Sequence, residues 1–403
     1  MKATIYPHKL RGQIEIPSSK SYAHRLLIAA ALANAPTEVR MNALNNDIAA
    51  TADCLRTLGA KIDRTENGFM VHPIGSLSSG GYTLFCGESG STLRFMIPVA
   101  AALGATCTFT GTGRLPERPN AILTEALNTH SVYTDSDLLP MHLTGQLSGG
   151  TYPIAGNVSS QYITGLLLAL PLCSEDGEII LTTKLESAAY IDITLETLSP
   201  FGIRIDRTEN GWRIPGGQKY RSPGTINAEG DWSGAAFWFA ANSLGSEIDC
   251  LGLNTNSLQG DRAIIAMLHR LGSEIDVSDT PDLVPALAVA AAAHPGTTRI
   301  TGAARLRIKE SDRLRTVADM LKNLGGDVDE LDDGLVIRGG APFTGGTVNG
   351  CNDHRIVMAA AIAATVAEGP VIITDAQAIN KSYPAFFEAF HQMGGIVNVE
   401  HDR

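Results

Sequence analysis

The heptapeptide I-D-R-T-E-N-G occurs twice in the chain, at Ile62–Gly68 and again at Ile205–Gly211. A similar segment precedes each copy, L-R-T-L-G-A-K before the first and L-S-P-F-G-I-R before the second. An apolar run that ends near a glycine is typical of a helix closed by a residue with positive φ, and a polar turn such as E-N-G is typical of a connection between two strands. The pattern therefore predicts a helix, a strand, a turn and a second strand at two distant places in the chain.

Further segments match the same pattern less closely. They begin at Leu268, Leu321 and Phe390, and a degenerate copy at Leu127 has a serine at the glycine position. The intervals between the glycine positions of successive copies are 72, 71, 70, 53 and 69 residues. Self-similarity at such a period indicates one supersecondary unit used repeatedly. Since 403 residues are too many for one ordinary core, we expect an α/β fold with two domains of three repeats each.

The composition excludes several classes of protein. A net charge of −11 and a pI near 5.4 repel nucleic acid and anionic membranes, so we expect neither as a partner. The six cysteines form no C-x-x-C pair, which argues against a structural zinc site or a disulfide framework and favours a reducing cytoplasm. The N-terminus has no apolar signal segment, and the longest apolar stretches are shorter than a membrane span. We expect a cytoplasmic protein.

One segment concentrates charge in this otherwise apolar chain. Between Arg307 and Arg313 it reads R-I-K-E-S-D-R, with five charged residues in seven positions, although only 18% of the chain is charged. If the segment is helical, Lys309 and Arg313 stand four apart on one face beside Glu310. Two cations next to a carboxylate suit a site that holds a phosphorylated substrate and moves a proton. The alternative is a helix start whose charges pair with one another at the surface.

Other segments combine helix-start residues with cations or hydroxyls. They are Pro17–Arg25, Cys86–Arg94, Gly113–Asn120, Asn157–Tyr162, Asn352–Arg355 and Asn380–Pro384. A helix N-terminus offers unpaired N–H groups and a positive dipole end, which favour anions. The segment at Cys86 lacks G-x-x-x-x-G-K-[ST], so a nucleoside triphosphatase is not supported, and Asp353-His354 has no second histidine at metal-ligand spacing. Each segment alone is more readily a cap or a surface cluster than a binding site; their number favours a polyanion site.

Together these motifs resemble the 5-enolpyruvylshikimate-3-phosphate synthase family, whose members are 3-phosphoshikimate 1-carboxyvinyltransferases. The resemblance covers essentially the whole chain. It rests on K-S-x-x-x-R at Lys20, R-L-x-E-R-P at Arg114, V-S-S-Q at Val158, E-G-D-x-S at Glu229, K-E-S-D-R at Lys309 and N-D-H-R at Asn352. It implies an inside-out α/β (α+β) barrel of two domains, each with three βαβαββ-type repeats around a pseudo-threefold axis, and an active site in the interdomain cleft. The domains would comprise residues 1–18 plus 229–403 and residues 19–228.

The resemblance also implies the site residues. The shikimate-3-phosphate contacts would be Lys20, Ser21, Arg25, Ser159, Ser160, Gln161, Ser187, Tyr190, Asp282 and Lys309. The phosphoenolpyruvate contacts would be Lys20, Gly90, Arg118, Gln161, Glu310, Arg313, Arg355 and Lys381. The catalytic residues would be Asp282, as base toward the substrate hydroxyl, with Glu310 and Lys20 as candidates for protonating C3 of phosphoenolpyruvate. The resemblance implies no metal or organic cofactor, and we expect a monomer whose partners are these two small molecules.

Three positions depart from the usual family pattern. Glu88 stands where asparagine is usual, Arg305 replaces a common asparagine, and Ala188-Ala189 replaces a common Lys-Pro. An extra carboxylate at Glu88 should weaken anion binding unless a cation such as Arg94 pairs with it. Gly90 is retained, so we expect inhibition by glyphosate.

Two other functions are less well supported by the sequence. The UDP-N-acetylglucosamine enolpyruvyl transferase family shares the fold and reaction type, but it typically has a cysteine in the loop that corresponds to Gly113–Asn120, and this chain has none there. A non-catalytic protein that binds polyanions or RNA is disfavoured by the low aromatic content of 6% and by the acidic pI.

Overall fold

The computed structural model describes residues 1–401, which form two compact units. The inserted unit is Ser18–Glu229, and the terminal unit combines Met1–Pro17 with the chain from Gly230 onward. The inserted unit includes one residue more at each crossing than predicted. At the first crossing, the Ser18 backbone N–H donates to Asn42 Oδ1 at 2.6 Å, and at the second the Glu229 carbonyl accepts from the Ser19 N–H at 2.7 Å. These bonds attach both crossing residues to the inserted unit.

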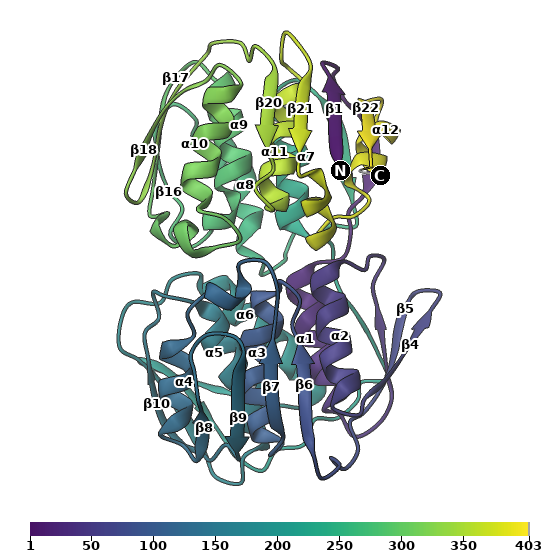
Figure 1. Ribbon diagram of the computed structural model, residues 1–403, viewed down its shortest axis with the longest axis vertical. Coiled ribbons are helices and arrows are strands. Elements are labelled where there is room, and N and C mark those ends of the chain that lie inside the picture. Colours follow the sequence, from purple (N-terminus) through teal and green to yellow (C-terminus); the bar gives the residue numbers. More distant parts are fainter. Residues whose placement is uncertain (402–403) are drawn as a thin grey trace. The chain divides into compact units, whose positions relative to one another are not determined.

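Three four-stranded sheets of identical strand order build the inserted unit (Figure 1). They are β14 (Thr225–Asn227)–β3 (Thr37–Arg40)–β5 (Gly68–His72)–β4 (Lys61–Thr65); β6 (Gly81–Phe85)–β7 (Thr106–Thr110)–β9 (Met141–Gly145)–β8 (Val132–Thr134); and β10 (Gly150–Ile154)–β11 (Gly177–Leu181)–β13 (Gly211–Ile214)–β12 (Asp206–Thr208). In each sheet the first two strands are parallel and the other pairs antiparallel. This order confirms the predicted strand–turn–strand pattern of the repeats.

Helices, not strands, occupy the centre of the inserted unit. The inner helices are α1 (Lys20–Ala31), α3 (Gly90–Ala102) and α5 (Ser160–Ala169), and nearly every residue in them is buried. Beyond their first two turns they are apolar all round, as expected for helices without a solvent face. The outer helices are α2 (Asn46–Thr57), α4 (Ala121–Asn128) and α6 (Ala188–Leu198). The inside-out α/β class predicted for the chain is therefore present within this unit.

The terminal unit repeats the plan with one sheet reduced. Its sheets are β16 (Glu274–Asp276)–β17 (Gly296–Thr301)–β19 (Gly334–Gly339)–β18 (Asp327–Leu331); β20 (Gly346–Asn349)–β21 (Val371–Thr374)–β1 (Lys2–Tyr6)–β22 (Ile396–Glu400); and the two-stranded β15 (Glu247–Leu251)–β2 (Arg11–Glu15). Strand β1, from the start of the chain, lies between β21 and β22, with Lys2 opposite Glu400. The strand at residues 2–6 thus completes a sheet whose other strands all come from residues 346–400.

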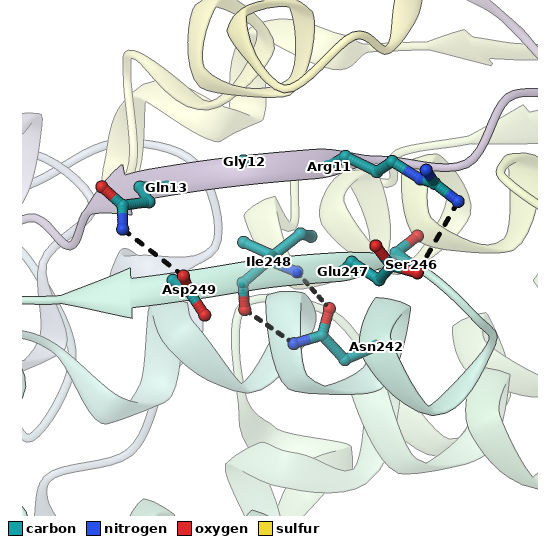
Figure 2. A pocket seen from close by; sticks show the side chains of 8 residues that line it. All are labelled: Arg11, Gly12, Gln13, Asn242, Ser246, Glu247, Ile248 and Asp249. Atoms are coloured by element: carbon teal, nitrogen blue, oxygen red, sulfur yellow. Dashed lines mark hydrogen bonds and ion pairs between the residues drawn. The ribbon is translucent and has the colours of Figure 1, made fainter.

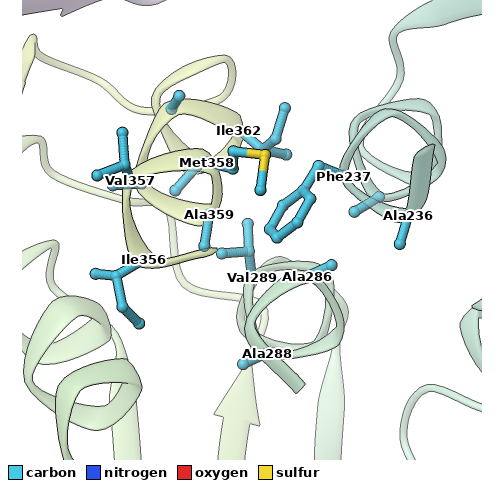
Figure 3. Packing of buried hydrophobic residues seen from close by; sticks show 14 of the residues in the cluster. Ala236, Phe237, Ala286, Ala288, Val289, Ile356, Val357, Met358, Ala359 and Ile362 are labelled. Carbon is cyan, nitrogen blue, oxygen red and sulfur yellow. The ribbon is translucent and has the colours of Figure 1, made fainter. Parts of the chain in front are cut away.

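Buried inner helices also form the core of the terminal unit. These are α7 (Trp232–Ser243), α9 (Val284–Ala293) and α11 (His354–Ala364). Figure 3 shows Phe237 of α7 directed toward Val289 of α9 and Met358 of α11, with alanines between the helices. Small side chains allow the helices to approach closely and pack densely. The outer helices are α8 (Ile264–Leu268), α10 (Arg313–Asn323) and α12 (Phe386–Gln392).

The repeat copy at Leu268 was predicted to lead into a hairpin, and this is wrong. After Gly272 the strand β16 pairs in parallel with β17 and thereby opens the next sheet. A hairpin is missing between these two repeats, which explains the short interval of 53 residues. Strand β15 consequently has β2 on one side only, and no other strand among residues 1–401 pairs with it.

A side chain covers the open edge of β15. Glu247 N–H donates to Leu10 O and Ile16 N–H donates to Leu251 O, so the alternate residue Ile248 directs its backbone groups away from β2. Asn242 Nδ2 donates to Ile248 O and Asn242 Oδ1 accepts from Ile248 N, both at 2.8 Å (Figure 2). The Asn242 amide thus takes the place of one strand residue beside β15, at the rim of a shallow surface hollow.

Backbone conformation identifies the six repeats most directly. The glycines at the repeat position, Gly59, Gly202, Gly272, Gly325 and Gly394, all have φ between 75° and 103°. Ser131, the serine of the degenerate copy, has φ of 63° and so adopts the same left-handed conformation. The prediction of six equivalent helix ends is confirmed. Among residues 1–401, no helix has both the length and the apolar character needed to cross a bilayer.

Candidate active site

The first cluster of predicted site residues lies at the starts of the inner helices of the inserted unit. The N-cap residues of α1, α3 and α5 are Ser19, Ser89 and Ser159, which carry no charge. Uncharged caps leave the positive ends of three helix dipoles uncompensated, and this favours anions. Lys20 opens α1, and its Nζ lies 2.8 Å from Asp47 Oδ2 near the start of α2. Asp47 was not predicted; it stands in no charged run of the sequence.

Gln161 and Arg94 join the starts of α3 and α5. Gln161 Oε1 accepts from Arg94 Nη1 at 2.7 Å, and Gln161 Nε2 donates to Ser91 Oγ at 2.9 Å. Arg94 is buried, and its Nε donates to Asn120 Oδ1 at 3.2 Å. Gln161, which the family resemblance placed among the contacts of both substrates, is therefore oriented by Arg94, which was not among the predicted site residues. Its position four residues after Gly90, on the same helix, is the sequence signal for it.

Gly90 and Arg118 lie in direct contact. A Cβ atom added to Gly90 would lie 2.9 Å from Arg118 Nη1, closer than side-chain atoms normally approach. Arg118 follows a 3₁₀ helix at Leu115–Glu117 and is 7% exposed. The unusual Glu88 packs its carboxyl group against Gly113, where an added Cβ atom would overlap that carboxyl group. Gly90 and Arg118, two of the four residues predicted to bind phosphoenolpyruvate in this unit, are thus adjacent.

Arg25, predicted to bind shikimate-3-phosphate, contacts the backbone of two other predicted residues, Ser21 and Tyr190. Its guanidinium donates to Thr194 Oγ1 at 2.8 Å and Thr164 Oγ1 at 3.2 Å, and to the carbonyls of Ser21 at 2.6 Å and Tyr190 at 3.1 Å. Burial lowers the pKa of Arg25 to about 10. Arg25 therefore ties α1 to α6, while Ser187 caps α6 with φ of 55° and Ser160 opens α5.

The second cluster is in the terminal unit and centres on Arg313. This side chain is 1% exposed and holds three carboxylates: Asp282 at 2.7 Å, Glu310 at 2.5 Å and Asp353 at 2.8 Å. The condition that Lys309–Arg313 is helical is not met, because α10 begins only at Arg313. The Asp312 side chain accepts from the Arg315 N–H and so sets the helix start. Lys309 and Arg313 are instead brought together at Asp282.

Asp282 lies close to three cations of this cluster. Lys309 Nζ lies 3.5 Å and Arg355 Nη2 lies 3.7 Å from its oxygens, in addition to the bond from Arg313. Burial alone would raise the pKa of Asp282, but the three cations outweigh it and hold the pKa well below its usual range. Asp312 pairs with Arg307 at 2.9 Å.

Arg355 and Lys381 complete the terminal cluster. Arg355 Nη2 donates to Ser233 Oγ at 2.7 Å, and Lys381 Nζ donates to the carbonyl of Asn352 at 2.6 Å, in the same N-D-H-R segment as Arg355. Asp261 is also buried here and was not predicted. Burial raises its pKa to about 6, although Arg355 acts in the opposite direction. Arg305 donates to the carbonyl of Ser278, near Asp282 in the chain.

The matches to known proteins agree with the fold. The family model described as EPSP synthase (3-phosphoshikimate 1-carboxyvinyltransferase) matches residues 5–280 and 272–390. The chain belongs to this family. It is 42% identical to the 3-phosphoshikimate 1-carboxyvinyltransferase of Clostridium kluyveri, over 98% of each chain, and 37% identical to that of Clostridioides difficile, also over 98% of each. An EPSP synthase structure from Acinetobacter baumannii superposes with a TM-score of 0.82 at 26% identity, covering 99% of this chain and 100% of the other.

Proposed function

We propose that this protein transfers the enolpyruvyl group of phosphoenolpyruvate to the 5-hydroxyl of shikimate-3-phosphate and releases phosphate. The observation that carries the proposal is the cluster of Asp282, Glu310 and Asp353 around the buried Arg313, in a chain of the EPSP synthase family. Lys309 and Arg355 add two further cations beside these carboxylates. Such a cluster combines groups that bind anions with groups that accept or donate a proton.

The reaction is an addition followed by an elimination. The 5-hydroxyl oxygen adds to C2 of phosphoenolpyruvate while C3 gains a proton, which gives a tetrahedral intermediate. The intermediate then loses a proton from C3 and phosphate from C2, so that the enol ether is restored and no oxidant or reductant is needed. We assign Asp282 as the base toward the hydroxyl, with Glu310 and Lys20 as the candidates for the proton transfer at C3.

The charge on the free protein suits this assignment. Three cations hold the pKa of Asp282 low, so its carboxylate is a weak base before substrates bind. Two bound polyanions would offset these cations and raise the proton affinity of Asp282 when it is needed. In the inserted unit, we propose Gly90, Arg118 and Gln161 as contacts for phosphoenolpyruvate. Ser21, Arg25, Ser159, Ser160, Gln161, Ser187 and Tyr190 are the proposed contacts for shikimate-3-phosphate.

The proposal includes the organisation of the protein. The two compact units are its two domains, it works as a cytoplasmic monomer, and it needs no cofactor. Lys381, Arg313 and Arg355 belong to the phosphoenolpyruvate contacts, and Lys20 and Lys309 to those of shikimate-3-phosphate, with Lys20 serving both.

Phosphate release from phosphoenolpyruvate tests the function, with shikimate-3-phosphate or UDP-N-acetylglucosamine as acceptor. Turnover with shikimate-3-phosphate alone is expected; turnover with neither acceptor refutes the proposal. Asp282→Ala should reduce kcat far more than it weakens substrate binding, by on the order of 10²-fold or more. Arg118→Ala should mainly raise the KM for phosphoenolpyruvate. If both variants changed only KM, the role of Asp282 as base would be wrong.

A further inference from the structure

Four buried polar side chains of the inserted unit form a continuous hydrogen-bonded chain. His24 Nδ1 lies 2.7 Å from Thr51 Oγ1, Thr51 Oγ1 lies 2.7 Å from Thr92 Oγ1, and Thr92 Oγ1 lies 2.8 Å from Ser89 Oγ. None of the four is more than 1% exposed. The chain starts on α1, crosses α2 and ends at the N-cap of α3. Four buried polar groups are costly unless each has a partner, so this arrangement is specific.

The direction of the chain follows from counting protons. Thr92 donates its one hydroxyl proton to Ser89 Oγ at 2.8 Å or to the Asp47 carbonyl at 3.3 Å. With the Thr92 proton placed in this way, Thr92 accepts from Thr51, and Thr51 accepts from His24. The reverse direction, from Thr92 through Thr51 to His24 Nδ1, would put the ring proton on the buried Nε2, which has no acceptor among residues 1–401. His24 must therefore carry its proton on Nδ1 and donate it. Its buried Nε2 has no hydrogen-bond partner in the structure, as expected for an unprotonated nitrogen.

The surroundings of His24 keep the ring neutral. Burial lowers the pKa of His24 well below its usual value, and Lys20 and Arg25 on the same helix lower it further. Phe95 of α3 presents its ring edge-on at 6.2 Å, and the Asp47 carboxylate at the start of α2 is already paired with Lys20. A Lys or Arg at position 24 would add a third cation to this helix turn, and a Leu would supply no donor.

The α3 end of this hydrogen-bonded chain contacts groups that the proposed function uses. Thr92 contacts the carbonyl of Asp47, whose carboxylate holds Lys20, and Ser89 accepts from the Thr92 N–H at 3.1 Å and so caps the helix that begins at Gly90. Loss of the His24 donor would leave the buried Thr51 hydroxyl oxygen without its hydrogen-bond donor. The relative placement of the two helix starts would then relax.

We infer that His24, as a neutral Nδ1–H donor, is a positioning residue that aligns the N-terminus of α3 and the Lys20–Asp47 pair for binding of the phosphoenolpyruvate anion. This inference rests on the proposed function for its substrate, but not for its geometry. His24 is not a catalytic residue, because it reaches the anion contacts only through Thr51 and Thr92.

Matched variants test the kinetic consequence. His24→Leu and Thr51→Val should raise the KM for phosphoenolpyruvate on the order of 10-fold, because a small displacement of binding groups has an effect of this size or larger. Their kcat should change less than about threefold. His24→Asn should stay near the wild-type KM, since its amide nitrogen can donate from nearly the position of Nδ1. Thr197→Val is the control: Thr197 is buried in the same unit, and its hydroxyl bonds only to Ile193 O of its own helix, at 2.7 Å.

Nuclear magnetic resonance tests the geometry without turnover. The ¹⁵N shifts of His24 should report a neutral ring protonated at Nδ1 down to pH 5, and Thr51→Val should shift the amide signals of Gly90 and Ser91 whereas Thr197→Val should not. A ring protonated at Nε2, or a doubly protonated ring at pH 6, would overturn the inference. So would equal amide shifts in the two threonine variants, or a rise in KM with Thr197→Val equal to that with Thr51→Val. Absence of turnover in the wild type would refute only the proposed function.

Discussion

Arg313→Met would leave three carboxylates clustered around an apolar side chain. In the native protein the Arg313 guanidinium bonds to Asp282, Glu310 and Asp353, the last of which is fully buried. Removing one partner of a buried ion pair typically costs about 3–5 kcal/mol, because the remaining charge loses its compensation. We expect a loss of this size in the free energy of unfolding of the terminal unit at pH 7.

The loss should depend on pH in a definite direction. Arg313 is one of the cations that depress the pKa of Asp282, so the native carboxylate stabilises the fold above its unfolded pKa and this contribution disappears as the pH falls. In the variant, burial without this cation disfavours the charged form of the carboxylates, most of all at the fully buried Asp353. Proton uptake then restores about 1.4 kcal/mol per pH unit for each carboxyl that protonates. The destabilisation should therefore be largest above pH 7 and shrink towards pH 5.

Urea denaturation at pH 5, 7 and 8 measures the effect, with Arg313→Lys as a second variant that keeps a charge. The control is Arg315→Met on the same helix, since the Arg315 side chain is 66% exposed and its carboxylate partners lie 3.5 Å and 3.8 Å away. Such exposed pairs contribute about 0–1 kcal/mol. A loss for Arg313→Met no larger than the control, or one that is equal at pH 5 and pH 8, would refute the account of this cluster.

Three further substitutions probe other features. Gly90→Ala places a Cβ 2.9 Å from Arg118 Nη1 and should displace that guanidinium, raising the KM for phosphoenolpyruvate on the order of 10-fold; an unchanged KM would contradict the contact. Asp261 has a folded pKa of about 6, above its usual 3.8, so its ionisation lowers the stability of the fold as the pH rises. In urea titrations, Asp261→Asn should therefore stabilise the protein by about 3 kcal/mol at pH 8 and little at pH 4. Equal effects at both pH values would contradict this. Asn242→Leu removes both hydrogen bonds to the Ile248 backbone, which should lower the free energy of unfolding by about 1–3 kcal/mol. It should also expose the edge of β15 and cause concentration-dependent association, measured by light scattering. A variant as stable and monodisperse as the wild type would show that this edge needs no cover.

The sequence repeat made most of the fold predictable, and one short interval between its copies indicated an irregular repeat. Positive φ at Ser131 shows that the degenerate copy was identified correctly, because the backbone geometry persisted after the glycine was lost. The missing hairpin after Gly272 was not predicted, although the interval of 53 residues marked it. Strand sequences such as E-I-D specify a strand but not its partner, and β16 pairs with the sheet that follows it.

The site was predictable where charge accumulates in the sequence and not where isolated residues meet in space. Lys309, Glu310 and Arg313 stand together in the chain, so their role could be proposed, but the helix start at Arg313 depends on the Asp312 cap. Asp261 stands in no comparable cluster of charge. Its proximity to Arg355 arises only when separate repeats pack together, which single-sequence patterns do not specify.

The place of β1 between β21 and β22 imposes an order on biosynthesis. Residues 2–6 leave the ribosome before the inserted unit, yet their two partner strands, residues 371–374 and 396–400, are made after it. All strands of the inserted unit, in contrast, have been made once Glu229 has emerged. The inserted unit can therefore complete its three sheets during translation, while β1 stays unpaired until synthesis is nearly finished. A nascent chain halted after residue 229 should already protect the inner helices of that unit from proteolysis, whereas its first seventeen residues should remain open to cleavage.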